Sequence, residues 1–129
     1  QGLDGHSDAD VLAHAISDAL LGAVRGGDIG KLFPDTDPAY KDADSLKLLA
    51  EVARFVRERG FEIIDVDSVI AAQAPKLSPY REAMRENLAA AMGVPVENVG
   101  VKATTTEHLG HEGREEGITA YATCLVCRI

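Results

Sequence analysis

The stretch Gly5–His14, with the sequence GHSDADVLAH, runs from a polar cluster directly into the apolar pattern of an amphipathic helix. The polar part suits a helix beginning, because Ser7 or Asp8 can serve as the N-cap and acidic side chains favour the positive end of the helix dipole. The pattern predicts a helix here, and the rest of the chain is expected to be organised around it.

Helical spacing places Asp10 and His14 four residues apart on one face of this helix, with Asp18 continuing the row. A neutral imidazole beside carboxylates commonly holds a divalent metal, and His6 at the start of the helix can face the same ligand. The alternative is that His14 is an ordinary helix histidine and that the acids form a solvated face. The stretch alone leaves both interpretations open.

The composition is that of one globular domain. The chain has 129 residues, 46% of them apolar, which is enough for one core of ordinary size. A formal net charge of −8, without a run of Lys or Arg, argues against nucleic acid or an anionic membrane as the main partner. No apolar run reaches the roughly 18 residues of a membrane span, and no signal peptide is visible at Gln1. Because the chain lacks an initiator Met and starts almost inside the polar stretch, we expect its natural N-terminus to lie upstream.

Apolar periodicity predicts three helices and three strands. The helices are expected at about residues 10–25, 45–59 and 78–92, and the strands at about residues 61–73, 99–105 and 117–129. This pattern predicts an α/β sandwich in which helices cover one face of a sheet. Three strands are few for an independent sheet, so we expect a further strand upstream or strands from other subunits.

The helix boundaries and apolar stripes can also be predicted. Gly26 and Gly27 are expected to end the first helix, Asp44 to cap the second, and Ser78 with Pro79 to open the third. The expected stripes are Val11, Ala15, Leu20, Leu21 and Val24 in the first helix, and Leu46, Leu49, Ala50, Ala53 and Val56 in the second.

Cys124 and Cys127 form a C-x-x-C pattern, which is found in redox and zinc sites. They lie in a β-rich run, where residues three apart point to opposite faces of the sheet. We therefore interpret both as small buried hydrophobic residues in a reducing compartment.

Three further stretches have the composition of a binding site. Residues 28–38 are too rich in Gly, Pro and Asp for regular structure, which indicates either a functional loop or a long ordinary connection. Lys102–Glu107, KATTTE, brings three hydroxyls and a carboxylate to the end of a strand, which suits a metal-bridged diphosphate, although threonine is also simply a good strand former. Residues 72–76, AQAPK, leave a strand as a loop whose backbone groups can read a base edge.

Together these stretches resemble one family, the 2-C-methyl-D-erythritol 2,4-cyclodiphosphate synthases of the non-mevalonate isoprenoid pathway. The resemblance rests on HSDAD with His14, on GDIG at residues 27–30 followed by LFPDTD at 32–37, on AQAPK at 72–76, and on KATTTE at 102–107. It extends over essentially the whole chain in the family's order and spacing. It implies a mixed sheet, with the sheets of several subunits packing around a trimer axis.

The resemblance implies that 4-CDP-2-C-methyl-D-erythritol 2-phosphate is cyclised to the 2,4-cyclodiphosphate with release of CMP. His6 and Thr105 would be catalytic, Ala72 to Lys76 would bind cytosine, and residues 33–37 would cover the substrate. The full set of implied substrate-binding residues is His6, Ser7, Asp28, Ile29, Gly30, Phe33, Pro34, Asp35, Thr36, Asp37, Ala72, Gln73, Ala74, Pro75, Lys76, Leu77, Ser78, Thr104, Thr105, Thr106, Glu107, His111 and Arg114.

The resemblance also implies two metals. His14 would bind zinc, whose other two ligands are expected upstream of Gln1, and Glu107 would bind a magnesium or manganese ion that bridges two phosphates. The chain departs from the family at His111, where an aromatic residue is usual, and at Glu115, where glycine is common. His108 and His111 are surplus metal ligands or, as we expect, exposed loop residues.

The family implies a cytoplasmic homotrimer with active sites between subunits, although a plastid location is open. Ala120, Ala122, Cys124 and Val126 form a face of small and apolar residues that can point to a shared core. Two alternatives remain open: a nucleotide-binding module without catalysis, and the cyclase part of a longer bifunctional chain.

Overall fold

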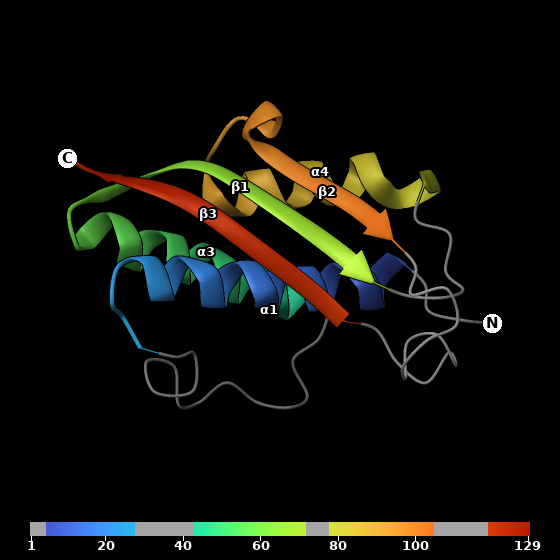
Figure 1. The fold of residues 1–129 in the computed structure, drawn as a ribbon, viewed down its shortest axis with the longest axis horizontal. Coiled ribbons are helices and arrows are strands. Elements are labelled where there is room, and N and C mark those ends of the chain that lie inside the picture. Colours follow the sequence, from blue (N-terminus) through green and yellow to red (C-terminus); the bar gives the residue numbers. More distant parts are fainter. Residues whose placement is uncertain (1–4, 28–42, 72–77, 105–118) are drawn as a thin grey trace.

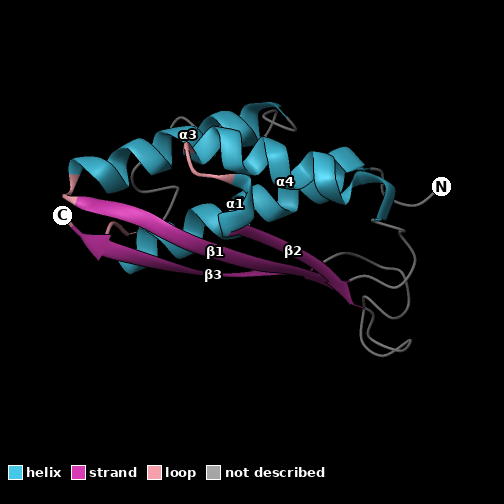
Figure 2. Cartoon of the chain, turned by 90° about the horizontal axis from the view of Figure 1, so that it is seen from above, coloured by secondary structure: helices cyan, strands magenta, loops and turns pink. Residues whose placement is uncertain are grey.

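The computed structural model describes residues 5–27, 43–71, 78–104 and 119–129. In chain order they form helix α1 (Gly5–Ala23), helix α3 (Ala43–Glu58), strand β1 (Phe61–Ala71), helix α4 (Ser78–Met92), the short 3-10 helix η1 (Val96–Asn98), strand β2 (Val99–Thr104) and strand β3 (Thr119–Arg128). The strands form one sheet, and α1, α3 and α4 lie together on one of its faces (Figures 1 and 2). The predicted fold class is confirmed.

The sheet is mixed, with β1 between β2 and β3. Strand β1 runs parallel to β2 and antiparallel to β3. At one end of the sheet, Ala71 lies opposite Thr104 on one side and Thr119 on the other. The last residue of β1, the last of β2 and the first of β3 therefore lie side by side at the same end of the sheet.

A bulge in β1 changes which side chains reach the core. Ile63 pairs with Val126 and Asp65 with Leu125, so Ile64 is an extra residue without a partner. A bulge shifts the alternation of faces by one residue. For this reason Ile63 and Val66, three residues apart, are both buried, whereas Ile64 is exposed.

The buried apolar residues of the described ranges form one cluster between the helices and the sheet. The predicted stripes were confirmed in part. Leu46 packs against the core cluster, whereas Val11, Ala15 and Ala50 are only partly buried. The predicted residues that are buried are Leu20, Leu21, Val24, Leu49, Ala53 and Val56. The buried residues that the prediction left out are Leu12, Ala13 and Ile16 in α1, and Leu48 and Val52 in α3. Both helices carry apolar residues on more than one side, so packing against neighbouring elements decided which side is covered.

Strand β3 packs its small residues against the chain's own helices. Ala120, Ala122, Cys124 and Val126 contact the core cluster, so the expectation that they point to a core shared between subunits was wrong. The opposite face carries Tyr121 and Leu125, both about 60% exposed (61% and 59%). The helices cover only one face of the sheet, and the small side chains fit beneath α1.

Both cysteines are free, and their predicted burial was only partly right. Cys124 is half-buried, its thiol donates to the carbonyl oxygen of Ala19 at 3.5 Å, and burial raises its pKa. Cys127 is exposed, because it lies one strand position out of phase with the covered face.

Helix α1 begins and ends earlier than predicted. It begins at Gly5, so Ser7 and Asp8 lie inside its first turns and are not the N-cap. Acidic and hydroxyl residues are also favourable there, because the first turn contains the unpaired N–H groups. At the other end, Arg25 has a φ of 60° and the N–H of Gly26 donates to the carbonyl of Leu21, which closes the helix at Ala23.

The other boundaries lie within one or two residues of the prediction. Helix α3 begins at Ala43, so Asp44 lies inside it, and η1 takes the place of the turn expected before β2. Helix α4 spans the predicted Ser78–Met92. Among the described helices, none has both the length and the apolar character needed to cross a bilayer.

Candidate functional site

The candidate site lies at the end of the sheet where Ala71, Thr104 and Thr119 meet. Because β1 and β2 are parallel, the segments that follow them, residues 72–77 and 105–118, both leave from this edge. Figure 1 shows that the N-terminal half of α1 lies at the same end. The topology therefore brings together the ends of three segments that the sequence singled out separately.

His14 lies on α1 with its ring held in one orientation. Its Nδ1 is 3.0 Å from the carbonyl oxygen of Asp10, and a carbonyl oxygen can only accept, so Nδ1 carries the hydrogen. In a neutral imidazole the Nε2 lone pair is then free. The side chain is 40% exposed. His14 is thus prepared to offer Nε2 to a ligand outside the helix, in the way that metal-binding histidines are oriented by a second hydrogen bond.

Asp10 adds an unusual feature beside this histidine. Its Oδ1 is buried and has no hydrogen-bond partner among the described residues. The same oxygen lies 3.9 Å from Nδ1 of His14, which is too long for a hydrogen bond. Buried carboxylate oxygens nearly always have a donor or a cation as partner. The Asp10 oxygen therefore indicates that this part of α1 is built for a positively charged or hydrogen-donating neighbour.

The described residues fit a zinc ion only in part. A catalytic zinc site has three protein ligands, and His14 supplies one nitrogen of the right kind. Within the described ranges no group of three or more His, Cys, Asp or Glu side chains can hold a metal. Asp18, which continues the row along α1, is exposed. Any further ligands would come from outside these ranges.

The end of β2 is fixed by contacts with β1. Ser68 is buried, and its hydroxyl donates to the carbonyl of Gly100 at 2.8 Å. On the other face, Nζ of Lys102 lies 2.6 Å from Oδ2 of Asp67. A Cβ atom on Gly100 would stand 2.5 Å from Oδ1 of Asp67, so the glycine leaves room for this carboxylate. The pairing holds Thr104 at the edge from which residues 105–118 depart.

Asp67 and Ser68 were not predicted as part of this framework. Their partners lie 35 and 32 residues away, on another strand. In the sequence they are two of four polar residues in β1, with Glu62 and Asp65. The sequence of one strand does not reveal which residues of another strand it contacts.

Most of the predicted site residues lie outside the described residues, or only their backbone is described. His6 and Ser7 lie within α1 and Ser78 begins α4, but their side chains are not described. The predictions at residues 28–37, 72–77 and 105–118 fall outside the described ranges, and these segments include the expected catalytic Thr105, the expected metal ligand Glu107, and Thr106, His108, His111, Arg114 and Glu115.

Comparison with known proteins decides the family. The profile described as the YgbB family matches residues 1–127. The chain belongs to the YgbB family. Two relatives of this YgbB chain named 2-C-methyl-D-erythritol 2,4-cyclodiphosphate synthase support the same conclusion. The enzyme of Laribacter hongkongensis is 61% identical over 126 residues, which cover 98% of this chain and 78% of the relative. The enzyme of Synechococcus elongatus is 59% identical over 127 residues, which cover 98% and 79%.

Solved structures resemble the YgbB chain in fold as well. The bifunctional IspDF of Campylobacter jejuni has a TM-score of 0.87 at 46% identity, and the match covers 100% of this chain and 35% of that one. The CDP complex of IspF from Plasmodium falciparum has a TM-score of 0.81 at 31% identity, covering 98% and 75%. The family resemblance found from the sequence motifs is confirmed, and the YgbB chain is an enzyme.

Proposed function

We propose that this chain converts 4-CDP-2-C-methyl-D-erythritol 2-phosphate into 2-C-methyl-D-erythritol 2,4-cyclodiphosphate. An oxygen of the 2-phosphate attacks the β-phosphorus, the bond between that phosphorus and the oxygen bridging it to the α-phosphate breaks, and CMP leaves with that oxygen. No oxidation is involved, so the protein needs only to position the phosphates and to stabilise their charge.

The observation that carries this proposal is membership of the family, at about 60% identity to enzymes named for this reaction (61% and 59%). The geometry supports it independently. Because β1 and β2 are parallel, they end at the same end of the sheet, where residues 72–77 and 105–118 begin. The part of α1 that carries His14 lies beside this end. A substrate with a base at one end and phosphates at the other needs recognition from several segments at one place.

His14 is the proposed zinc ligand, through Nε2. The hydrogen bond from Nδ1 to the Asp10 carbonyl supports this role, because it holds the ring and its tautomer before any ligand binds. When bound, zinc would act as a Lewis acid on a phosphate oxygen. The chain's own contribution is a rigid helix that presents the nitrogen, with the buried Oδ1 of Asp10 adding negative charge nearby.

The remaining roles are assigned by resemblance to the family. His6 and Ser7 would contact the methylerythritol phosphate, Thr105 would orient the phosphates, and Glu107 would hold a magnesium or manganese ion. Residues 72–76 would bind the cytosine base. The CDP complex of the Plasmodium falciparum relative supports a cytidine diphosphate ligand in this fold.

We also propose a single domain that assembles as a cytoplasmic homotrimer. The face of the sheet opposite the helices supports an assembly, because it exposes Ile64, Tyr121 and Leu125. The two relatives described above come from bacteria, which supports a cytoplasmic location.

The test is CMP release by the full-length protein from the cytidine-diphosphate-linked 2-phosphate, with zinc content measured on the same sample. We expect CMP and the cyclic diphosphate in equal amounts, and turnover that falls when zinc is removed by a chelator and returns when zinc is added. Nucleotide binding without CMP release would overturn the proposal and indicate a binding module.

A further inference from the structure

A cavity lies at the other end of α1, away from His14. It has a volume of about 640 Å³ and is lined by residues from the end of α1, the end of α3, the start of β1 and the end of β3. The lining side chains that matter are three arginines, Arg25, Arg59 and Arg128, two aromatic rings, Phe55 and Phe61, and one carboxylate, Glu58. None of these residues belongs to the candidate site at the opposite end of the sheet.

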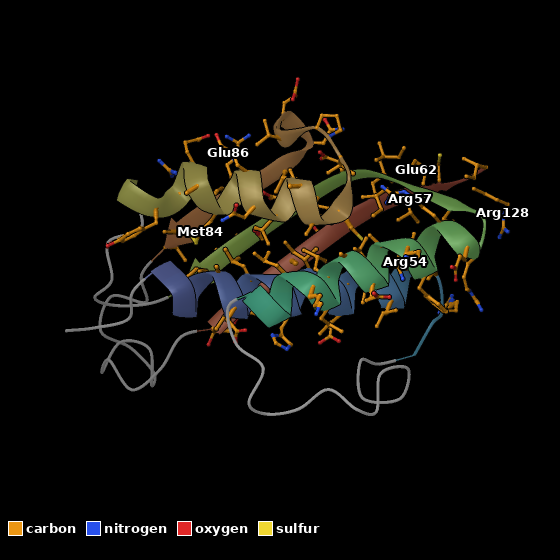
Figure 3. All side chains as sticks on the ribbon, turned by 180° about the vertical axis from the view of Figure 1, so that it is seen from behind. Arg54, Arg57, Glu62, Met84, Glu86 and Arg128 are labelled. Atoms are coloured by element: carbon orange, nitrogen blue, oxygen red, sulfur yellow. The ribbon has the colours of Figure 1, made fainter. Side chains whose placement is uncertain are left out.

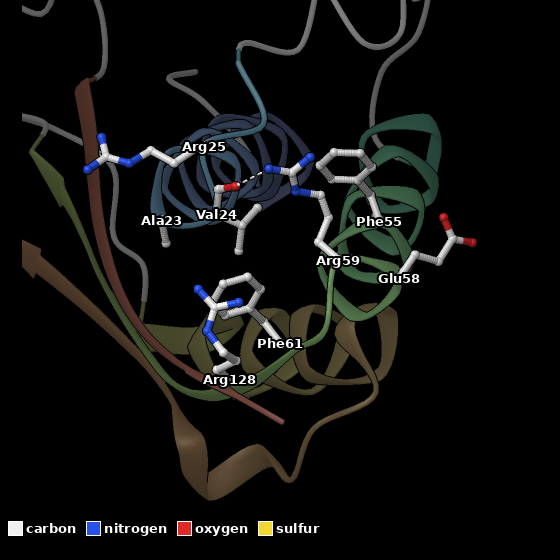
Figure 4. A pocket seen from close by; sticks show the side chains of 8 residues that line it. All are labelled: Ala23, Val24, Arg25, Phe55, Glu58, Arg59, Phe61 and Arg128. Carbon is white, nitrogen blue, oxygen red and sulfur yellow. Dashed lines mark hydrogen bonds between the residues drawn. The ribbon is translucent and has the colours of Figure 1, made fainter.

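Two of the arginines are stacked on the two rings. The guanidinium carbon of Arg128 lies 4.8 Å from the centre of the Phe61 ring, and that of Arg59 lies 5.5 Å from the centre of the Phe55 ring. Figure 4 shows the Arg59 guanidinium beside the carbonyl of Val24, and the Arg128 guanidinium beside the Phe61 ring on the other side of Val24. Stacking fixes the plane of a guanidinium while its N–H edge stays available, which is the arrangement that binds phosphate through two donors.

Within the part of the chain that the structure describes, no ion pair balances the arginines of this cavity. Arg25, Arg59 and Arg128 form no ion pair within the described ranges, and Arg59 donates only to the carbonyl of Val24, at 3.0 Å. The one carboxylate, that of Glu58, points away from the two stacked arginines in Figure 4. By contrast, four other described cations form ion pairs, namely Arg54–Glu51, Arg57–Glu62, Arg85–Glu82 and Lys102–Asp67. Three arginines that have no ion pair among the described residues thus line one cavity in a chain of net charge −8.

The backbone beside the cavity is arranged to place these groups. Arg25 has a φ of 60°, a conformation that glycine usually supplies at a helix end. Glycine occupies the next position instead, where a Cβ atom on Gly26 would stand 2.7 Å from Cε2 of Phe55. Gly26 therefore leaves room for the ring on which Arg59 is stacked, while Arg25 keeps a charged side chain at the rim.

We propose that this cavity binds a small organic anion, a phosphate ester whose other end is an aromatic or apolar group. The N–H edges of Arg59 and Arg128 bind the phosphate, Arg25 adds a third positive charge from the rim, and Phe55 and Phe61 contact the apolar part. The site is distinct from the proposed cyclase site and does not depend on that function.

The test uses phenyl phosphate as the probe, added to the full-length protein and followed by NMR of the backbone amides. Saturable shifts are expected at Gly26, Gly60 and Ile129, at millimolar concentrations. Phenol, which lacks the charge, and inorganic phosphate, which lacks the ring, are expected to bind at least about tenfold more weakly, because each loses one of the two kinds of contact.

Variants locate the site. Arg128→Gln is expected to weaken phenyl phosphate binding about tenfold, and Arg25→Gln to weaken it less. Arg54→Gln is the matched control, because Arg54 lies on α3, close in sequence to Arg59, but is paired with Glu51 outside the cavity. Equal affinity in Arg128→Gln and the unchanged protein, shifts confined to other amides, or equal binding of phenol would each overturn the proposal.

Discussion

The two ends of helix α1 carry opposite chemistry and are built in different ways. Toward its N-terminus, Asp10 and His14 are four residues apart and contact each other directly, with Nδ1 of the ring on the Asp10 carbonyl. At its C-terminus, the charged groups come from three places: Arg25 follows α1, Arg59 follows α3, and Arg128 ends β3. The first arrangement is local in sequence, and the second exists only once the helices and strands have packed.

This difference shows that a functional surface can be found from sequence when its parts are close along the chain or follow an ordered set of motifs. Asp10 and His14 meet by helical spacing alone. Arg59 and Arg128 are separated in sequence by β1, α4, η1, β2 and most of β3, and nothing in their local sequences links them. The following predictions test whether the two ends are also independent in function and stability.

The largest effect is expected from His14→Ala in the full-length protein. Loss of the proposed zinc ligand should remove bound zinc and lower CMP release about a thousandfold, since a Lewis acid contributes several kcal/mol and each 1.4 kcal/mol is a factor of ten. The free energy of unfolding of the metal-free protein should change little, because the ring is 40% exposed.

Asp18→Asn is the matched control, because Asp18 is exposed one turn further along the same helix. It should keep both zinc and turnover. Binding of phenyl phosphate to the cavity at the C-terminal end of α1 should be the same in His14→Ala and Asp18→Asn. Near-normal turnover of His14→Ala would disprove the assigned role.

A pair of glycine substitutions should affect stability in opposite directions. Gly26→Ala should lower the free energy of unfolding by about 1–3 kcal/mol, because its Cβ would stand 2.7 Å from Phe55. Gly22→Ala, one turn earlier in open space, should raise it by about 0.5–1 kcal/mol, because alanine is the better helix former. Urea unfolding of both variants measures the difference. A Gly26→Ala protein as stable as Gly22→Ala would show that the Phe55 ring is not held against this turn.

Replacing Arg25 by glycine should stabilise the end of the helix by up to about 1 kcal/mol. Glycine adopts a φ of 60° without a steric penalty, although its extra freedom in the unfolded chain offsets part of the gain. Arg25→Gln removes the charge but keeps the Cβ atom, so its stability should match that of the unchanged protein. Thermal unfolding compares the three, and a glycine variant less stable than the glutamine variant would contradict the strain argument.

The smallest effect concerns Glu62 near the cavity. Hydrogen bonds from Arg57, with Nη2 3.0 Å from Oε2, hold the pKa of the Glu62 carboxyl below its ordinary value (Figure 3). A depressed pKa stabilises the fold above the ordinary carboxyl pKa of about 4.3, and this contribution is lost as pH falls through the folded-state value. The Arg57 and Glu62 side chains are 33% and 38% exposed, so solvent screens the pair, and we expect at most a few tenths of a kcal/mol at neutral pH.

Glu62→Gln should therefore be slightly less stable than the unchanged protein at pH 7 and equally stable in acid. Glu86→Gln on α4 is the control, because Glu86 is exposed and has no ion-pair partner among the described residues. Urea unfolding at several pH values would show the difference. If the difference in free energy of unfolding between Glu62→Gln and the unchanged protein grew as the pH fell, the lowered pKa of Glu62 would be contradicted.

The sequence predicted the order of the described helices and strands, because strong periodicity and glycine or proline signals marked most of their ends. It predicted less well which side chains are buried. In α1, apolar residues on several sides left the covered side undetermined, and Leu12 and Ile16 were missed for this reason. In β1, the bulge at Ile64 shifted the alternation, and a bulge is created by pairing with β3.

At the site, sequence motifs identified the family and the Asp10–His14 pair, because both depend on residues close together or on an ordered pattern along the chain. The buried oxygen of Asp10, which has no hydrogen-bond partner among the described residues, and the Asp67–Lys102 pair became visible only in three dimensions. Burial and pairing across strands depend on every element that packs nearby, and one-dimensional spacing does not contain that information.

The sequence by itself thus determined the fold class, the family and the chemistry expected near the start of α1. The tertiary structure decided the register of the sheet, the covered side of each helix and the cluster of arginines at the far end of α1. The physical reason is the range of the interactions: helical spacing and capping act over a few residues, whereas burial, strand pairing and charge clustering arise from elements that meet only in the folded chain.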